Sequence, residues 1–303
     1  MEHFADRLAA AVRRTGNPVC VGLDPRAKNL PGGMLGDDTS PPAIAGAYAQ
    51  FCNGVCDVVA SLIPVVKVQA AFFEELGPYG MKAMALVIDH AQSCGLLVIV
   101  DAKRNDIGST AEAYARGYLG REESAWHADA LTVSPYLGDD SLSPFVEVAQ
   151  DRGAGIFVLV KTSNPGGGLL QDLTADGHTI YRQVAAHVER LAEETVGKCG
   201  YGAVGAVVGA TYPEQLVELR AAMPRTWFLV PGYGSQGGTA ADVAAAFDAQ
   251  GLGAIVNNSR GIIFANERSE FATGFGVASW QSAVDAATRE MIAALAPYCC
   301  VRK

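Results

Sequence analysis

Short runs of apolar, largely β-branched residues recur along the chain, separated by longer segments in which apolar residues repeat with helical spacing. The runs lie at Pro18–Leu23, Pro64–Val68, Leu96–Val100, Ala130–Val133, Gly155–Val160, Ala203–Val208, Trp227–Val230 and Ala254–Val256. Several of them lack polar alternation, which is typical of strands covered on both faces. The pattern therefore predicts eight buried strands.

Helical periodicity fills most of the intervals between these runs. It is clearest at Ala43–Ser61, Met81–Cys94, Ser109–Gly120, Thr179–Val196, Pro213–Met223 and Thr239–Gln250. Strands alternating with helices predict a parallel sheet of the α/β class. Eight such units in 303 residues fit a closed (β/α)₈ TIM barrel, whereas an open doubly wound sheet more often stops at five to seven strands.

No Ser-rich or Pro-rich linker divides the chain, so we expect a single domain over residues 1–303. Two long loops interrupt it, at about residues 25–42 and 164–177, and loops of this length are more often functional than idle. The second loop and the loop around Tyr233 are candidate lids. Further helices are predicted at the N-terminus, from Met1 to Asn17, and at Ser279–Ala296, where a helix would close or flank the base of the barrel.

Composition narrows the class of protein. Apolar residues make up 50% of the chain, and 23 basic against 32 acidic residues give a net charge of −9. That charge disfavours a nucleic-acid or anionic-membrane binder. The longest strongly apolar run is far too short to span a bilayer. Seven cysteines without a Cys-x-x-Cys pair disfavour a disulfide framework and a zinc site, and the sequence predicts a cytoplasmic protein.

Charged residues stand at the ends of the predicted strands, where a TIM barrel carries its active site. Asp101 and Lys103 follow the third run, and residues two apart in an extended segment face the same side. Lys67 lies within the apolar second run, where an unpaired ammonium would be costly to bury. The alternatives are a surface ion pair at the strand end and a lysine at a strand edge facing water.

The segment Gly232–Gly237 matches the dinucleotide fingerprint G-x-G-x-x-G. A Rossmann site also needs an acidic residue at the end of the next strand, where this chain has Asn257. The same glycines suit an anion cradle after strand seven, formed by backbone N–H groups and the start of the next helix. Arg260 would then grip a phosphate. An ordinary Gly-rich turn is the alternative.

Several motifs together resemble the orotidine 5′-phosphate decarboxylase family, in its longer bacterial branch. The motifs occur in the family's order and spacing, at Val21–Pro25, Lys67, Asp101–Thr110, Thr132–Tyr136, Lys161–Pro165, Pro231–Gly234 with Gln236, and Asn258–Gly261. The resemblance covers about Val19 to Gly261. It implies a homodimeric (β/α)₈ barrel with shared active sites that converts orotidine 5′-monophosphate to UMP and CO₂ in pyrimidine biosynthesis, without metal or cofactor.

The resemblance also implies residue roles. Lys67, Asp101, Lys103 and Asp106 match the charged catalytic array, with Lys103 as the proton donor to C6 and Asp106 entering the neighbouring subunit's site. The substrate-binding positions match Asp24 and Thr110 for the ribose, Ser134 for the pyrimidine edge, and Gln236, Arg260 and Gly234 for the phosphate. Ser134 stands where several members of this branch carry Asn.

The sequence leaves three alternative functions, each of which the residues favour less. A metal-dependent sugar-phosphate decarboxylase or synthase needs carboxylates for Mg²⁺, commonly one on the second strand, where Lys67 would repel the metal. A catalytically silent nucleotide-binding barrel would show a broken charge array, yet all four charged positions are present. A dinucleotide oxidoreductase rests on the glycines of Gly232–Gly237 alone.

Overall fold

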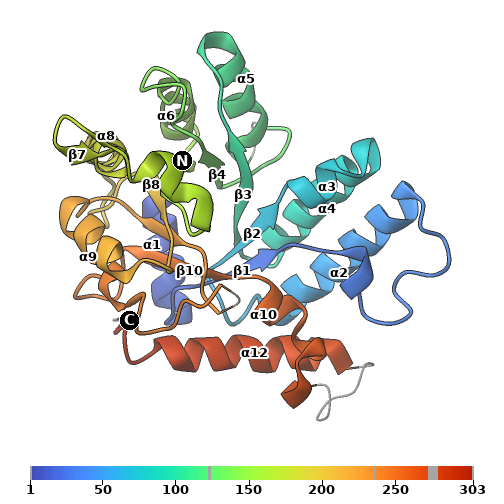
Figure 1. Cartoon of the computed structure of the whole chain (residues 1–303). Coiled ribbons are helices and arrows are strands. Elements are labelled where there is room, and N and C mark those ends of the chain that lie inside the picture. The colour runs from blue at the N-terminus through green and yellow to red at the C-terminus, as the bar shows by residue number, and fades with distance from the viewer. Residues whose placement is uncertain (1, 122–123, 235, 272–278, 302–303) are drawn as a thin grey trace.

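Eight parallel strands close into a barrel in the computed structural model, which describes residues 2–121, 124–234, 236–271 and 279–301 (Figure 1). Neighbouring strands follow the order β1-β10-β9-β8-β5-β4-β3-β2 around the barrel. The barrel strands are β1 (Val19–Leu23), β2 (Val65–Gln69), β3 (Leu97–Arg104), β4 (Ala130–Val133), β5 (Gly155–Lys161), β8 (Val204–Val208), β9 (Phe228–Val230) and β10 (Ala254–Asn258). The predicted TIM barrel is confirmed, and each predicted strand overlaps one of these.

Helices surround the strands and complete the α/β architecture (Figure 1). The helices are α1 (Phe4–Thr15), α2 (Pro41–Val59), α3 (Ala71–Glu74), α4 (Gly77–Ser93), α5 (Gly108–Tyr118), α6 (Ser143–Asp151), α7 (Gly168–Gln171), α8 (Ile180–Glu194), α9 (Pro213–Ala222), α10 (Arg260–Ile263) and α12 (Trp280–Leu295). The loop at 25–42 holds one 3₁₀ turn, Ala27–Asn29. The loop at 164–177 holds α7 and leads into a small hairpin of β6 (Thr174–Ala175) and β7 (His178–Thr179).

The prediction of a helix at Thr239–Gln250 is wrong, because this segment forms turns and only a 3₁₀ helix at Ala244–Ala246. A turn around Asp248 occupies the end of this segment in place of helix. The Asp248 carboxylate accepts the backbone N–H groups of Gln250 and Leu252 at 2.7 and 2.9 Å, and the Tyr201 hydroxyl at 2.9 Å. These bonds hold a tight turn where a helix would have to continue.

The inside of the barrel changes from apolar to polar along β2 and β3. Successive residues of a strand point to opposite sides, so every second residue faces inward. In β2 the inward series is Val65, Lys67 and Gln69. In β3 the series Leu97, Ile99, Asp101 shows the same change. These two strands therefore carry apolar side chains near the base and polar side chains near the mouth, whereas β5, β8 and β9 keep part of the cavity wall apolar with Leu159, Val207 and Leu229.

Helix α1 covers the base of the barrel, behind the strands in Figure 1. It buries Phe4 and Leu8, together with Ala5, Ala9, Ala11 and Val12, in the cluster that also holds the inward side chains of the strands. The Phe4 ring meets Phe157 of β5 edge-on, with centroids 6.0 Å apart. Gly155 leaves space for Phe4, because a Cβ at residue 155 would lie 2.2 Å from the ring.

The C-terminal helix α12 flanks the barrel and packs against α2 (Figure 1). The Trp280 ring at its start lies 5.1 Å from the ring of Phe51 in α2. The predicted helix at 279–296 is thus present, and α1 rather than α12 closes the base. Among the helices of the described residues, none is both long and apolar enough to cross a membrane.

We predict that Phe4→Ala lowers the free energy of unfolding by about 3 kcal/mol, because it opens a cavity between α1 and the base of the barrel. Urea unfolding at neutral pH measures the change. Ala10→Ser, on the exposed side of the same helix, is the matched control and should change the midpoint little. Equal midpoints for the two variants would show that α1 does not seal the base.

Candidate active site

A cavity of about 260 Å³ opens at the carboxyl ends of the strands. Side chains from β2, β3, β4, β5, β8, β9 and β10 line it, together with residues that follow β1, β5, β9 and β10. The polar lining residues are Asp24, Lys67, Gln69, Asp101, Lys103, Thr132, Thr162, Ser163, Asn164, Tyr233, Gln236, Asn257, Ser259 and Arg260. The structure thus brings Asp24, Lys67, Asp101, Lys103, Gln236 and Arg260, all predicted from the sequence, to one cavity.

The Asp101 carboxylate is the centre of the charged cluster. Its Oδ2 accepts the Lys67 ammonium at 2.9 Å and the Gln69 amide at 3.0 Å. Its Oδ1 accepts the Lys103 ammonium at 2.7 Å and the Thr132 hydroxyl at 2.8 Å. Four donors therefore satisfy both oxygens of a residue that is only 7% exposed.

Burial and charge act in opposite directions on this cluster, and charge prevails. Burial by itself would raise the pKa of Asp101, but the Lys67 and Lys103 ammonium groups lower that pKa well below its usual range. Burial would lower the pKa of Lys67, but Asp101 and Asp24 raise that pKa above its ordinary value. Both groups are therefore charged at neutral pH, although Lys67 is only 4% exposed.

Lys103 reaches Asp101 through a β-bulge. The pairing of β3 with β4 shifts register between Val100 and Arg104, and Lys103 has a φ of 47°, in the left-handed region. Such a conformation costs a non-glycine residue about 1–3 kcal/mol and is often found at functional sites. The backbone N–H of Lys103 donates to the Thr132 hydroxyl at 3.0 Å. The bulge leaves the Lys103 side chain 48% exposed at the mouth.

Asp24 lies beside the same cluster and has acceptor capacity to spare. Its Oδ1 is 3.8 Å from the Lys67 ammonium, too far for a hydrogen bond. This buried oxygen has no hydrogen-bond partner among the described residues. A buried, unpaired carboxylate oxygen at a cavity wall fits the hydroxyl of a ligand.

Gln236 and Arg260 lie at the rim of the cavity, Gln236 on the loop after β9 and Arg260 at the start of α10. Gly232, Gly234 and Gly237 have positive φ values of 98°, 69° and 95°, so this loop turns sharply. No helix of more than one 3₁₀ turn follows the loop in the described residues up to β10, so the helix expected to contribute to the anion cradle is missing. Backbone N–H groups, an amide and a guanidinium remain available for an anion.

Four predicted site residues lie outside this cavity. Asp106 lies on the β3–α5 loop and is half-buried. Thr110 lies at the start of α5 and is exposed. The Asp106 carboxylate accepts its neighbour's N–H, that of Ile107, at 2.9 Å. Ser134 lines a separate, largely apolar cavity beside the hairpin loop, and Gly234 borders a third cavity next to α12.

The loop at 164–177 is attached to the end of β5 by polar bonds. Gln171 accepts the N–H of Thr162 at 3.0 Å and donates to its hydroxyl at 2.8 Å. Lys161 is buried, pairs with Asp172 of this loop, and lies 4.7 Å from the centre of the Tyr212 ring. These contacts hold the loop beside the cavity that Thr162 lines.

The cavity also contains Gln69, Thr132 and Asn257, which were not predicted as site residues from the sequence. Each is a polar residue at an inward position near the end of a strand. Strand alternation could have identified Gln69, because it lies two residues after Lys67 and therefore faces the same side of β2. The donors to Asp101 could not be assigned without the pairing register, which sets Gln69 opposite Asp101.

Comparison with known proteins gives a consistent result. The chain matches the model of the orotidine 5′-phosphate decarboxylase / HUMPS family over residues 17–274. It is 60% identical to an orotidine 5′-phosphate decarboxylase of Rhodopirellula baltica, covering 96% of this chain and 98% of the relative. It is 42% identical to the enzyme of that name from Deinococcus radiodurans, with the same coverage. The OMP decarboxylase structure from Leishmania donovani superposes with a TM-score of 0.76 at 34% identity, covering 98% of both chains.

We predict that Asp101→Asn lowers the free energy of unfolding by about 3 kcal/mol at pH 7, because the buried Lys67 ammonium loses its nearest counter-charge. The folded-state pKa of Asp101 is lowered, so its contribution is present above about pH 4, the pKa of Asp in an unfolded chain, and is lost as the pH falls through the folded value. Urea midpoints of both proteins between pH 7 and pH 3 measure the gap.

The gap should stay constant from pH 7 to pH 5 and narrow below about pH 4. The raised pKa of Lys67 adds no change in this range, because that contribution is lost only when the pH rises above the ordinary lysine value. Asp37→Asn, at an exposed carboxylate, is the control and should show little gap at any pH. A gap that widens in acid would contradict the assignment of Asp101 as a stabilised anion.

Proposed function

The chain belongs to the orotidine 5′-phosphate decarboxylase family, and we propose that it decarboxylates orotidine 5′-monophosphate with the charged cluster at its barrel mouth. The reaction makes it a carboxy-lyase that produces UMP and CO₂ in pyrimidine biosynthesis. The observation that carries the assignment of the site is the Asp101 carboxylate between two ammonium groups, at the wall of a cavity whose rim holds Arg260.

The substrate would lie across the mouth with its phosphate at the rim. Gln236 and Arg260 would hold the phosphate, because a guanidinium forms paired, charge-assisted bonds with phosphate oxygens. The unpaired Oδ1 of Asp24 would accept a ribose hydroxyl. Ser134 would contact the pyrimidine edge from the loop after β4. Binding energy from the phosphate would serve to exclude water and orient the ring.

The chemical difficulty is a carbanion that the pyrimidine ring cannot delocalise. When the bond from C6 to the carboxylate carbon breaks, the electron pair stays on C6 and CO₂ leaves. The Lys103 ammonium, which Asp101 holds at 2.7 Å, would stabilise this charge before the proton moves. Its Nζ–H bond then breaks as a C6–H bond forms, and the neutral amine regains a proton from water.

Asp101 would face the carboxylate of the substrate. Two like charges about 4 Å apart repel by roughly 4 kcal/mol at an effective dielectric constant near 20, and the two lysines offset part of this. Rate enhancements by enzymes correspond to about 8–23 kcal/mol. Repulsion in the ground state is therefore the smaller contribution, and stabilisation of the carbanion by Lys103 is the larger one.

Asp106 and Thr110 would complete the site of a second subunit. Both lie away from the cluster of their own chain, Asp106 on the β3–α5 loop and Thr110 in the first turn of α5. The Asn105 side chain joins this loop to the one after β4 by donating to the Ser134 carbonyl. The two loops expose Ile107 and Tyr136, which are 55% and 77% exposed. Apolar side chains beside functional residues support a homodimer with shared active sites.

Two further proposals concern the surroundings of the site. The loop at 164–177 would act as a lid, because Asn164 lines the cavity and Gln171 holds the loop to β5. The loop around Tyr233 would close the phosphate side.

A cytoplasmic location stays a prediction, which rests on the cysteine pattern of the sequence.

We predict that Lys103→Ala lowers kcat at least about 10³-fold, since it removes both the proton donor and the charge beside C6. Binding of UMP, followed by calorimetry, should weaken less than tenfold, because the phosphate contacts remain. Lys82→Ala, at an exposed lysine of α4, is the matched control and should keep full turnover. Near-normal turnover in Lys103→Ala would remove Lys103 from the mechanism.

We predict that two inactive variants, Asp106→Ala and Lys103→Ala, regain activity when their subunits are mixed. In a mixed dimer one site has lost both residues, and the other has both intact. Random exchange makes half of the dimers mixed, so about a quarter of the wild-type activity should return if Asp106 crosses the interface. Dimers verified as mixed by two affinity tags and still inactive would show that each subunit works alone.

A further inference from the structure

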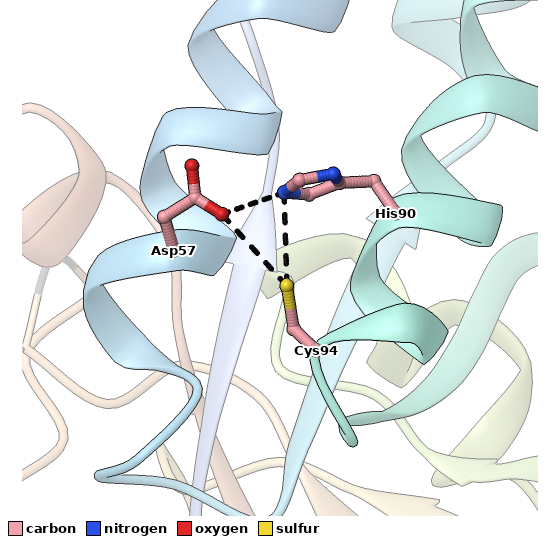
Figure 2. A group of neighbouring side chains, drawn as sticks. All are labelled: Asp57, His90 and Cys94. Atoms are coloured by element: carbon pink, nitrogen blue, oxygen red, sulfur yellow. Dashed lines mark hydrogen bonds and ion pairs between the residues drawn. The ribbon is translucent and has the colours of Figure 1, made fainter.

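Three side chains of metal-binding types meet on the outside of the barrel, between α2 and α4 (Figure 2). Asp57 comes from the last turn of α2, and His90 and Cys94 come from the end of α4, four residues apart and therefore on one face of the helix. Figure 2 shows all three pointing toward one another. Neither the proposed decarboxylation nor the cavity at the mouth involves any of them.

We propose that Asp57, His90 and Cys94 bind one divalent transition-metal ion, of the kind that zinc and cobalt represent. An imidazole nitrogen, a thiolate sulfur and a carboxylate oxygen are the three ligand types that tetrahedral zinc takes from proteins. The absence of Cys-x-x-Cys pairs in the sequence does not exclude this site, because its ligands come from two helices.

The distances between the ligand atoms fit a tetrahedral ion. His90 Nε2 lies 3.6 Å from Cys94 Sγ, and Asp57 Oδ1 lies 3.8 Å from the same sulfur. Zinc bonds of about 2.0 Å to oxygen and nitrogen and about 2.3 Å to sulfur, at tetrahedral angles, would separate these pairs by roughly 3.5–3.6 Å. Only the Asp57–His90 pair, now 2.7 Å apart, would need to open, to about 3.3 Å.

The hydrogen bonding of the group also favours an ion. Asp57 and Cys94 both approach Nε2 of His90, so one ring atom faces two partners. A single N–H can serve the carboxylate well but leaves the sulfur at 3.6 Å with a weak contact. A cation at the centre of the triangle would accept a lone pair from each of the three atoms.

The site would have an open fourth position. The Asp57 side chain is 57% exposed and the His90 side chain is 32% exposed, so water can reach the ion. The helices beneath are held firmly, because Cys56 of α2 and Ala91 of α4 are fully buried next to the ligands in sequence. The ligand atoms are thus presented by a packed scaffold, which lowers the entropy lost on binding.

The position in the fold predicts a structural role. Cys94 lies just before β3 and Asp57 just before the loop that leads to β2, so the site is at the base of the barrel. The mouth is at the opposite ends of these strands. A bound ion would fasten α2 to α4 below the strands that carry Lys67 and Asp101, and it would stabilise the fold without taking part in turnover.

The test is titration of the reduced, metal-free full-length protein with Co²⁺, followed by absorption spectroscopy. We expect one equivalent of cobalt to give a thiolate-to-cobalt charge-transfer band and intense visible bands of tetrahedral cobalt, both abolished by added Zn²⁺. The midpoint of thermal unfolding should rise by a few degrees at saturating metal. Turnover should be the same with and without metal.

Variants locate the site. Cys94→Ser should abolish the charge-transfer band, and His90→Ala and Asp57→Ala should each weaken cobalt binding at least about tenfold. Cys300→Ser, at an exposed thiol outside the group, is the matched control and should bind as wild type does. Normal turnover of each variant verifies its fold.

Two results would overturn the proposal. The first is an absence of any thiolate band in the wild-type protein at saturating cobalt, which would leave the three residues as a hydrogen-bonded contact between helices. The second is a band that survives in Cys94→Ser, or is lost in Cys300→Ser, because the ion would then bind a different thiol.

Discussion

The buried carboxylate of Asp101 is the constraint on which the mouth of the barrel depends. Removing an ion from water costs several kcal/mol unless other groups replace its hydration. Lys67 and Gln69 of β2, Lys103 of β3 and Thr132 of β4 supply that replacement. The donors stand on three adjacent strands, so the pairing register of these strands and the charge state of the site are set together.

The same barrel keeps a dry base and a polar mouth because of the period of its strands. Inward positions of β2 and β3 hold apolar residues in the first half of the strand and polar residues in the second half. Close packing between strands depends on small residues as well. A Cβ at Gly22 of β1 would lie 1.9 Å from the hydroxyl of Ser259, which lines the cavity. Along β2 and β3, the residues that stabilise the core and the residues that line the polar site thus lie at opposite ends of the strand.

Much of this arrangement could be predicted from the sequence, because burial on both faces leaves uninterrupted apolar runs. All eight strands, and the cavity residues Lys67, Asp101 and Lys103, were predicted in this way. What could not be predicted depends on tertiary contacts. The carboxylate of Asp248, which accepts the Tyr201 hydroxyl, holds a turn at the end of a predicted helix, and a bulge rather than strand alternation turns Lys103 toward Asp101. Asp106 lies apart from the cluster of its own chain. The group that it would contact in a second subunit cannot be predicted from the sequence of one chain.

The helix at the base has a consequence for how the molecule is made. Translation produces α1 before the barrel strands, and the cluster that α1 completes includes Trp227 and Ile255, which are produced more than two hundred residues later. The apolar face of α1 therefore lacks part of its native contacts while more than two hundred residues are synthesised. At 5–20 residues per second this takes about ten seconds or longer. During synthesis the apolar face of α1 is therefore available for non-native association, and this is the stage at which we expect a chaperone to bind the chain.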